Sequence, residues 1–593
     1  MFWDPLFTEL SDIVGAPTDQ LKVSIQSYPH AYLAHTAQLI FSLLVAFPLG
    51  SIFVRLPSAH PNVAHLFSIT ISTTFLVLLL GLGGGMLHML FSSLGTYAIV
   101  NGMKGKNMPW VVFAFVMGHL LFNHIKRSVL GLPASTIEIT GSQMVLVMKL
   151  STFAWNIHDG KRKEEELDTN QLATRLTQIP SLVAFLGYCF FFPSVLVGPS
   201  FDYATYDALI HKRLYSSPPA GSSPEQAKAT KSRIPYGRKR VAYLHLVIGL
   251  FFLGVYALYG DKYSYENVLS PIWTGWGWTR KFGFVQLAGL LARTKYYAVW
   301  SLSEGACILT GIGFNGYDPK TGRTLWNRVR NINIKGIETA ESFKILFDSW
   351  NCRTNVWLRD VVYKRVTKKG KKSGFKESMA TFLTSAFWHG ISPGYYLAFF
   401  MGGLVTSLGR QFRRYVRPYF LPLSGTAQTG LPKRIYDLIG WISVQSTLNY
   451  LVAPFLLLDF KNSIDAWNRM YWYGHVAVII SMCFMSFGGR KALKRGLDKR
   501  KPRITPSVKV SPPSPPVDST APPPPEDEMD STDLRWVKHA LDNPEYQDSG
   551  EAVAMGVAIR DHGFLDKWIE GEETPGATPG GTPKNEKDDP LRK

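Results

Sequence analysis

Cysteine is scarce in this 593-residue chain, and its four cysteines lie far apart at positions 189, 307, 352 and 483. A disulfide framework needs closely spaced cysteines, and a structural zinc site needs pairs such as CxxC. Neither pattern occurs in the sequence. The cysteines therefore give no support for a disulfide-rich scaffold or for a zinc site.

Nucleotide-binding and metalloenzyme motifs are missing as well. The sequence contains no GxxxxGK[ST] phosphate loop and no HExxH zinc motif. Gly311, Gly313 and Gly316 fit GxGxxG, but an apolar segment precedes them and a basic loop follows, where a dinucleotide fold needs a strand and a helix. We therefore expect no metal ion and no nucleotide cofactor.

A cleavable signal peptide is also not apparent, because the first residues, MFWDPLFTELSD, are acidic and aromatic instead of basic. Long apolar runs are abundant instead, and with their flanks they approach the roughly 20 residues that cross a bilayer. The clearest runs are Leu39–Val54, His65–Leu90, Trp110–Phe122, Ile179–Val197, Val241–Tyr259 and Val476–Met485. We expect an all-α polytopic membrane protein with about eleven spans, together with re-entrant and interfacial helices.

Positive charge is concentrated outside the C-terminal tail. The chain carries a net charge of +20, and from Lys501 onward 11 basic and 18 acidic residues give −7, which leaves +27 for the rest. Since the basic residues lie between apolar runs, they indicate cytosolic loops facing phosphates more than a nucleic-acid partner. We expect a membrane-embedded domain over 1–488 and a cytosolic tail over 489–593, basic at first, then Pro- and Gly-rich and mostly disordered.

Polar connections divide the membrane domain. Residues 1–36 are predicted to form an amphipathic lead-in, and the charged segment 159–178 an interfacial helix. The turn-rich segment 201–240 is predicted to be a mobile cytosolic loop. A second long loop, 315–378, contains 15 basic and 6 acidic residues.

The most informative segment is SAFWHGISPGYY, in which His389 lies in the middle of an apolar stretch. An ionisable residue at that depth is a functional candidate, although a histidine hydrogen-bonded between packed helices is an equal alternative. The glycines and Pro393 that follow predict a break in the helix, which would open space beside the imidazole. Trp388 and Tyr395 are candidates for the walls of that space. Imidazole suits acyl transfer because it accepts a proton near neutral pH.

A second segment, SWNCRTNVWLRDVVYKR, offers amide side chains. Asn351 and Asn355 are four residues apart and would share one face if the segment is helical. An amide positions a hydroxyl or donates to a carbonyl oxygen. The alternative is an interfacial segment, with Trp350 among belt aromatics and arginines facing headgroups. Two other nucleophiles are weaker candidates: Cys352 lacks an adjacent histidine, and Ser385, one turn before the histidine, is better explained by close helix packing.

Together these segments resemble the membrane-bound O-acyltransferase (MBOAT) family, and within it the fungal lysophospholipid acyltransferases. The similarity rests on five motifs in the expected order, which cover about 150–400. They are KLSTFAWNIHDG (149–160), LVGPSFDY (196–203), SEGACILTGIGFNG (303–316), SWNCRTNVWLRD (349–360) and FWHGISPGYY (387–396). WHGxxPGY is typical of the branch that acylates lysophospholipids.

The resemblance implies that His389 is the catalytic histidine and that Asn351 is the second catalytic residue, with Asn355 as a competitor. It implies substrate contacts from Trp388, Tyr395, Asn355 and Trp350 around a central chamber. Acyl-CoA would enter from the cytosol as co-substrate and the lysolipid from the bilayer, with no further cofactor, and the family points to the endoplasmic reticulum membrane. No His is followed five positions later by Asp, the spacing of the other large glycerolipid acyltransferase class.

The sequence therefore predicts an acyl-CoA-dependent O-acyltransferase acting on lysophospholipids. Within the family the alternatives are a sterol, diacylglycerol or protein acceptor. From another class, a secondary transporter also combines broken helices with a midplane polar site, although no duplicated pattern is visible here. The lipid headgroup, the acyl chain and the oligomeric state are not indicated by any motif.

Overall fold

The described part of the chain is built from helices. The computed structural model describes residues 29–133, 136–216, 234–318, 321–367, 374–421 and 430–500. Within these ranges no strand is present apart from an isolated bridge between Tyr317 and Thr324. The chain divides into two units after Arg503, and every described residue belongs to the first. The predicted all-α class is confirmed.

Eleven long helices and nine shorter ones account for most of the residues that the structure describes. The long ones are α3 (Pro29–Phe53), α4 (Pro61–Thr73), α5 (Gly83–Gly102), α6 (Met108–Val129), α7 (Ile139–Asp159), α12 (Arg238–Tyr259), α13 (Trp278–Thr310), α18 (Phe375–His389), α19 (Pro393–Tyr415), α20 (Leu431–Leu457) and α22 (Tyr473–Phe484). The short ones are α8 (Thr169–Thr174), α9 (Leu182–Cys189), α10 (Tyr203–Ile210), α14 (Ile334–Glu338), α15 (Phe343–Ser349), α16 (Cys352–Trp357), α17 (Lys364–Val366), α21 (Phe460–Arg469) and α23 (Arg490–Arg500). In the described residues three π-helical stretches, Thr74–Leu79, Leu358–Tyr363 and Met485–Gly489, continue α4, α16 and α22.

Several helices face lipid. Among the described residues, five segments are long and apolar enough to span a bilayer by themselves: Thr36–Phe53, Pro61–Leu79, Met108–Val129, Arg238–Tyr259 and Tyr473–Arg500. Helix α12 is an example, because its side chains Val247, Phe251 and Leu258 are 63%, 62% and 73% exposed. Exposed apolar surface of this kind belongs against hydrocarbon. The chain is a membrane protein, and the count of about eleven spans stays a prediction.

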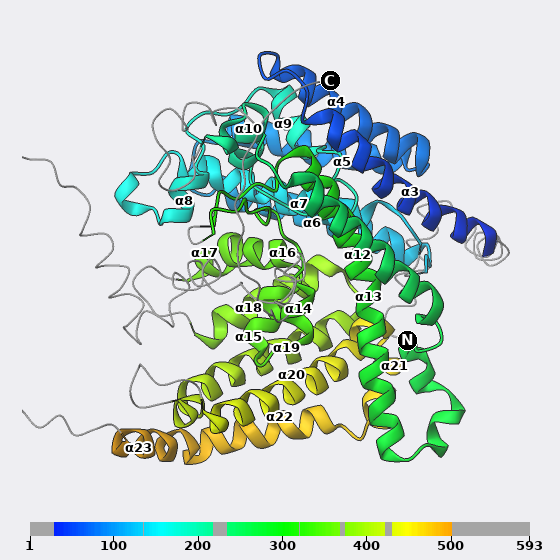
Figure 1. The fold of residues 1–593 in the computed structure, drawn as a ribbon, viewed down its shortest axis with the longest axis vertical. Helices are drawn as coiled ribbons and strands as arrows, with labels where there is room; N and C mark the ends of the chain where they lie inside the picture. The colour runs from blue at the N-terminus through cyan, green and yellow to red at the C-terminus, as the bar shows by residue number, and fades with distance from the viewer. Residues whose placement is uncertain are drawn as a thin grey trace, which may run out of the picture. The chain divides into compact units, whose positions relative to one another are not determined.

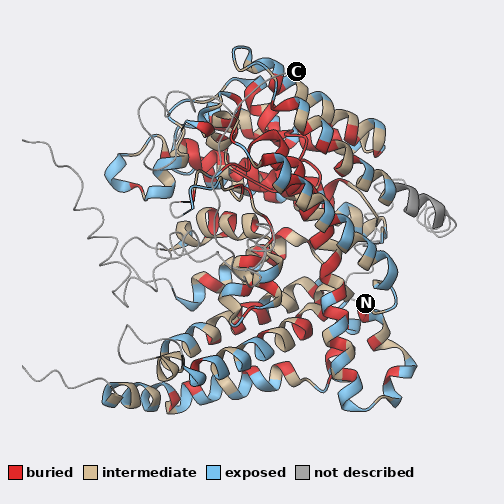
Figure 2. Ribbon diagram, in the orientation of Figure 1, coloured by how far each residue is buried: buried red, intermediate tan, exposed pale blue. Residues whose placement is uncertain are grey.

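Helix α7 lies at the centre of the core. Nearly all of its residues are buried, including the polar Gln143, Lys149 and Ser151. Figure 2 shows buried residues concentrated around α7 and α9, whereas α20 and α22 carry long exposed stretches. In Figure 1, α12 and α13 run side by side, and α18, α19 and α20 form a second packed group. A helix that is buried on all sides is a fixed support for the segments packed against it. The site described below packs against α7.

The connections differ from their predicted form. The segment 159–178 is not one interfacial helix, because Asp168 caps the separate short helix α8 in a capping box with Gln171. The segment 201–240 is partly helical, since Asp202 caps α10, and 217–233 lies outside the described residues. Both changes follow from aspartates that satisfy free N–H groups at helix starts.

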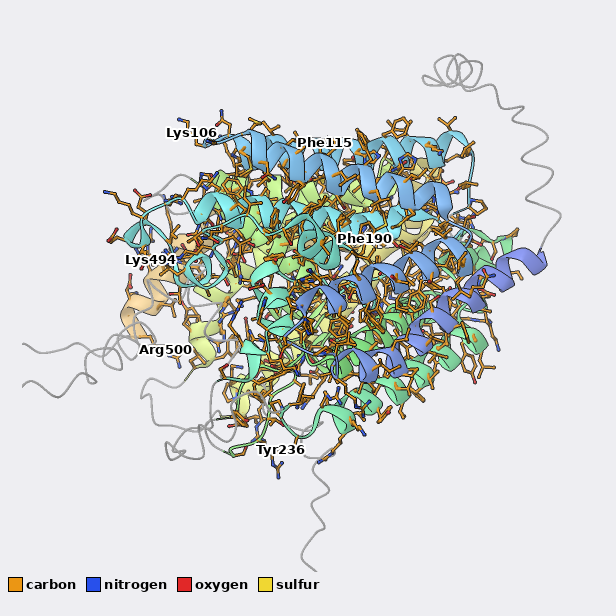
Figure 3. The ribbon with its side chains drawn as sticks, turned by 90° about the horizontal axis from the view of Figure 1, so that it is seen from above. Lys106, Phe115, Phe190, Tyr236, Lys494 and Arg500 are labelled. Carbon is orange, nitrogen blue, oxygen red and sulfur yellow. The ribbon has the colours of Figure 1, made fainter. Side chains whose placement is uncertain are left out.

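The long loop 315–378 contains four short helices, α14 to α17, so it is folded over much of its length. The basic run that ends the membrane domain begins as helix α23, which is the last part of the apolar segment Tyr473–Arg500. Figure 3 places its Lys494 and Arg500 at the periphery, whereas Phe190 is buried. The remaining predictions for the lead-in (1–28) and the tail (501–593) lie outside the described residues.

Candidate active site

His389 stands at a break between two helices. It is the last residue of α18, and Gly390 follows with φ 137° and ψ −167°. Helix α19 then begins at Pro393, whose fixed φ suits the first helical turn. The predicted break is therefore confirmed. It leaves the imidazole half-buried at a helix end, where the free backbone groups of the last turn also lie.

Four aromatic rings surround the imidazole. The ring centroids of Trp388 and Tyr395 lie 4.8 Å and 5.5 Å from that of His389, so both predicted walls are adjacent to it. Phe399 and Phe455 each lie 5.1 Å away, and neither was singled out from the sequence. Phe399 follows Tyr395 by one helical turn, a spacing that predicts a shared face. No comparable signal pointed to Phe455, which comes from α20.

The backbone around the histidine is fixed by a second histidine. His124, on α6, is buried, and its Nε2 lies 3.2 Å from the carbonyl oxygen of Trp388. That carbonyl is in the last turn of α18, so the contact satisfies a group that the break leaves free. No motif in the sequence pointed to His124.

Asn351 does not lie within a helix. It precedes α16 in a left-handed conformation, with φ 43° and ψ 54°. Its Oδ1 accepts a hydrogen bond of 2.8 Å from the Thr354 hydroxyl. Asn355 lies inside α16 and its Nδ2 donates to the carbonyl of Phe347. The expectation that both asparagines share one helix face was wrong, because the helix begins only after Asn351.

Asn351 is held by a neighbouring loop. The backbone N–H of Cys352 donates to the carbonyl of Asn331 at 2.8 Å, and the N–H of Arg353 lies 3.4 Å from the Asn331 Oδ1. Asn331 in turn donates its own N–H to Glu304 Oε2 at 2.9 Å. Glu304 is 1% exposed and belongs to α13. The SEGAC motif thus supports the asparagine through one intervening residue.

Helix α7 connects the two segments. The indole of Trp388 donates to the Met144 carbonyl at 3.1 Å, and the Thr354 hydroxyl lies 3.3 Å from the Met148 sulfur. Four residues make about one helical turn, a rise of about 6 Å. Trp388, which precedes His389, and Thr354, which is hydrogen-bonded to Asn351, therefore contact α7 one turn apart.

Trp350 has different surroundings. Its ring packs against Tyr296 and Trp300 of α13, each with a centroid distance of 5.3 Å. The ring contacts of His389 come instead from α18, α19 and α20. A substrate contact from Trp350 stays a prediction, and its present neighbours are those of a packing residue.

The rival nucleophiles are poorly placed. The Cys352 thiol donates to the carbonyl of Asp348 at 3.1 Å, and burial raises the pKa of this thiol to about 12. A thiol with a raised pKa is a weak nucleophile because little thiolate is present. Among the described residues, no hydrogen bond joins Ser385 to His389. Neither residue therefore competes with the histidine.

Comparison with known proteins identifies the family of the chain. The MBOAT, membrane-bound O-acyltransferase family, matches residues 129–453, more than half of the 593-residue chain. The chain is 38% identical to a lysophospholipid acyltransferase of Schizosaccharomyces pombe, over 83% of this chain and 91% of that one. It is 40% identical to a lysophospholipid acyltransferase of Saccharomyces cerevisiae, over 77% and 74%. It is also 30% identical to the human membrane-bound glycerophospholipid O-acyltransferase 2, over 81% and 87%. With His389 and Asn351 inside the matched region, the chain belongs to the membrane-bound O-acyltransferase family.

Proposed function

We propose that this chain is a lysophospholipid acyltransferase that takes its fatty acyl group from acyl-CoA and uses His389 as the general base. The observation that carries the proposal is a half-buried imidazole at a helix break, surrounded by aromatic rings inside a membrane protein. The named activity of the fungal relatives supports the acceptor class. Acyl transfer between a thioester and a hydroxyl requires a base at such a position.

The imidazole of His389 accepts the proton of the lysophospholipid hydroxyl as the oxygen attacks the thioester carbonyl. A carbon–oxygen bond forms, the carbon–sulfur bond breaks, and the imidazolium returns its proton to the departing CoA thiolate. The reaction needs no covalent enzyme intermediate and no metal or other cofactor. The imidazole suits both proton transfers because one ring nitrogen accepts a proton and can then donate the same proton.

Asn351 is proposed to stabilise the developing oxyanion. Its Oδ1 already accepts from Thr354, so the Nδ2 protons are directed elsewhere. An amide N–H₂ donates two hydrogen bonds, and one aimed at the thioester oxygen would strengthen as charge develops. Losing one such donor lowers kcat by about 10²–10³. Asn355 suits this role less well, because its Nδ2 is bonded to Phe347.

The membrane side is proposed from the charge distribution. Helix α23 carries six basic residues and one acidic residue, as the sequence RKALKRGLDKR shows. Basic segments beside a span face the cytosol. The C-terminal tail would then be cytosolic, acyl-CoA would enter from that side, and the proposed location is the endoplasmic reticulum membrane. Protease protection of a tail epitope in sealed microsomes tests this orientation.

Purified wild-type enzyme, assayed against a panel of lysophospholipids and acyl-CoAs, tests the proposal. His389→Ala should abolish transfer at equal protein level, and Asn351→Ala should lower kcat about 10²–10³-fold. Asn355→Ala is the matched amide control and should retain most activity. Wild-type activity in His389→Ala would refute the base, and an acyl thioester trapped on Cys352 would refute direct transfer. Transfer to a sterol, diacylglycerol or protein, with none to lysophospholipids, would refute the acceptor.

A further inference from the structure

Two of the four aromatic rings around the His389 imidazole are phenylalanines from different helices. Phe399, on α19, lies nearly parallel to the imidazole, with an interplanar angle of 25° at 5.1 Å. Phe455, on α20, meets it edge-on, with an angle of 83° at 5.1 Å. The two phenylalanine rings also contact each other at 6.0 Å and 70°. Together the two rings restrict rotation of the imidazole about its Cβ–Cγ bond.

In the part of the chain that the structure describes, no hydrogen bond holds the His389 imidazole in its orientation. Among the described residues, no donor or acceptor is bonded to either imidazole nitrogen of His389. In a serine protease an aspartate fixes the catalytic imidazole through one ring nitrogen. No such partner is present here among the described residues, so ring packing is left to orient the imidazole. Offset and edge-to-face arrangements at such distances are favourable and directional.

The position of Phe455 is rigidly defined by its helix end. The N–H of Gly394 donates to the Leu458 carbonyl at 2.8 Å, which joins the start of α19 to the end of α20. A side chain on Gly394 would collide with the Pro454 carbonyl, so the two backbones are in direct contact. Leu458 ends α20 with φ 63°, a conformation that non-glycine residues seldom adopt. The end of α20 thus cannot shift without disturbing the helix break beside His389.

We propose that Phe455 is a positioning residue for catalysis, which acts with Phe399 to hold the imidazole of His389 in its productive orientation. The inference rests on the proposed function, because it assumes that the imidazole is the base. A base displaced by about 1 Å loses about 100-fold in rate. Phe455→Leu keeps an apolar side chain but removes the flat edge that restrains rotation.

The test is steady-state kinetics of purified Phe455→Leu with acyl-CoA and a lysophospholipid. We expect kcat to fall about 10- to 100-fold, with both KM values changed less than about twofold, because a misaligned base weakens the transition state alone. Phe455→Tyr retains the ring and should restore most of kcat. Phe400→Leu is the matched control, since Phe400 neighbours Phe399 but is 47% exposed on the outer face of α19.

The outcomes separate the two proposals. If the wild-type enzyme does not acylate lysophospholipids, the proposed function fails. If wild type is active and His389→Ala is inactive, but Phe455→Leu keeps its kcat, the positioning role of Phe455 is overturned. A raised KM with unchanged kcat also overturns it, because Phe455 would then bind substrate. Should Phe455→Leu not fold in detergent, Phe399→Leu provides the same test from α19.

Discussion

Gly390 should tolerate no side chain, and Gly390→Ala should inactivate the enzyme. The residue has φ 137° and ψ −167°, a region that is essentially restricted to glycine. A Cβ there would also lie 3.3 Å from the Nδ1 of His124 and 3.5 Å from the Cε2 of Tyr395. Both neighbours are buried or half-buried, so they have little room to move. An alanine must therefore rotate the backbone that immediately follows His389.

The magnitude follows from the backbone strain. An L-residue held in such a region costs about 1–3 kcal/mol. If the backbone relaxes instead, the population with His389 in its productive position falls by the same free energy, about 5- to 150-fold at 1.36 kcal/mol per factor of ten. Displacement of the imidazole lowers the rate of the remaining molecules further. We expect kcat below about one hundredth of the wild-type value.

The assay is acyl transfer by purified protein, normalised to the monodisperse fraction in detergent. Gly118→Ala is the matched control, because Gly118 lies inside α6 and a Cβ there would meet nothing within 4 Å. Alanine in a helix interior should stabilise that variant by about 0.5–1 kcal/mol and leave activity unchanged. Wild-type kcat in Gly390→Ala, with Gly118→Ala also active, would show that the helix break does not position the histidine.

Three further outcomes are expected. Glu304→Ala removes the acceptor for the Asn331 N–H, which should lower the free energy of unfolding by about 1–3 kcal/mol and lower kcat. Glu304→Gln keeps an acceptor oxygen and should retain more activity. Equal loss of activity in both variants would show that the charge of Glu304 matters instead of its hydrogen bond. Arg365→Met leaves Asp159, 1% exposed, without its bidentate partner, so the melting temperature in detergent should fall. Adding Asp159→Asn to this variant should partly restore the melting temperature. An unchanged melting temperature in Arg365→Met would refute a stabilising ion pair. Trp388→Phe loses one indole hydrogen bond to α7, worth about 1 kcal/mol, and should lower kcat more than stability; a purely thermal effect would contradict a role beside His389.

Local signals predicted the helix break because its cause is local. Glycine and proline in HGISPG restrict backbone geometry wherever they occur, so the end of α18 at His389 could be expected without tertiary information. Phe399 was recoverable in the same way, since it follows Tyr395 by one turn. The different placement of Asn351 and Asn355 was not predictable from the sequence, because it depends on the residue at which α16 begins. Helix starts vary by one or two residues for reasons outside the segment itself.

The sequence by itself determined the membrane class, the all-α architecture and the histidine, since apolar run length, helix breakers and a lone ionisable residue are properties of short stretches of chain. Only the tertiary structure decided what surrounds that histidine. Phe455 packs against His389 from α20, and Glu304 of α13 binds Asn331, which in turn holds the segment of Asn351. The positions of these residues in the sequence do not predict the contacts, because contacts between helices depend on how whole helix faces pack together. The candidate histidine could therefore be named from the sequence, whereas the residues that pack around it could be named only from the fold.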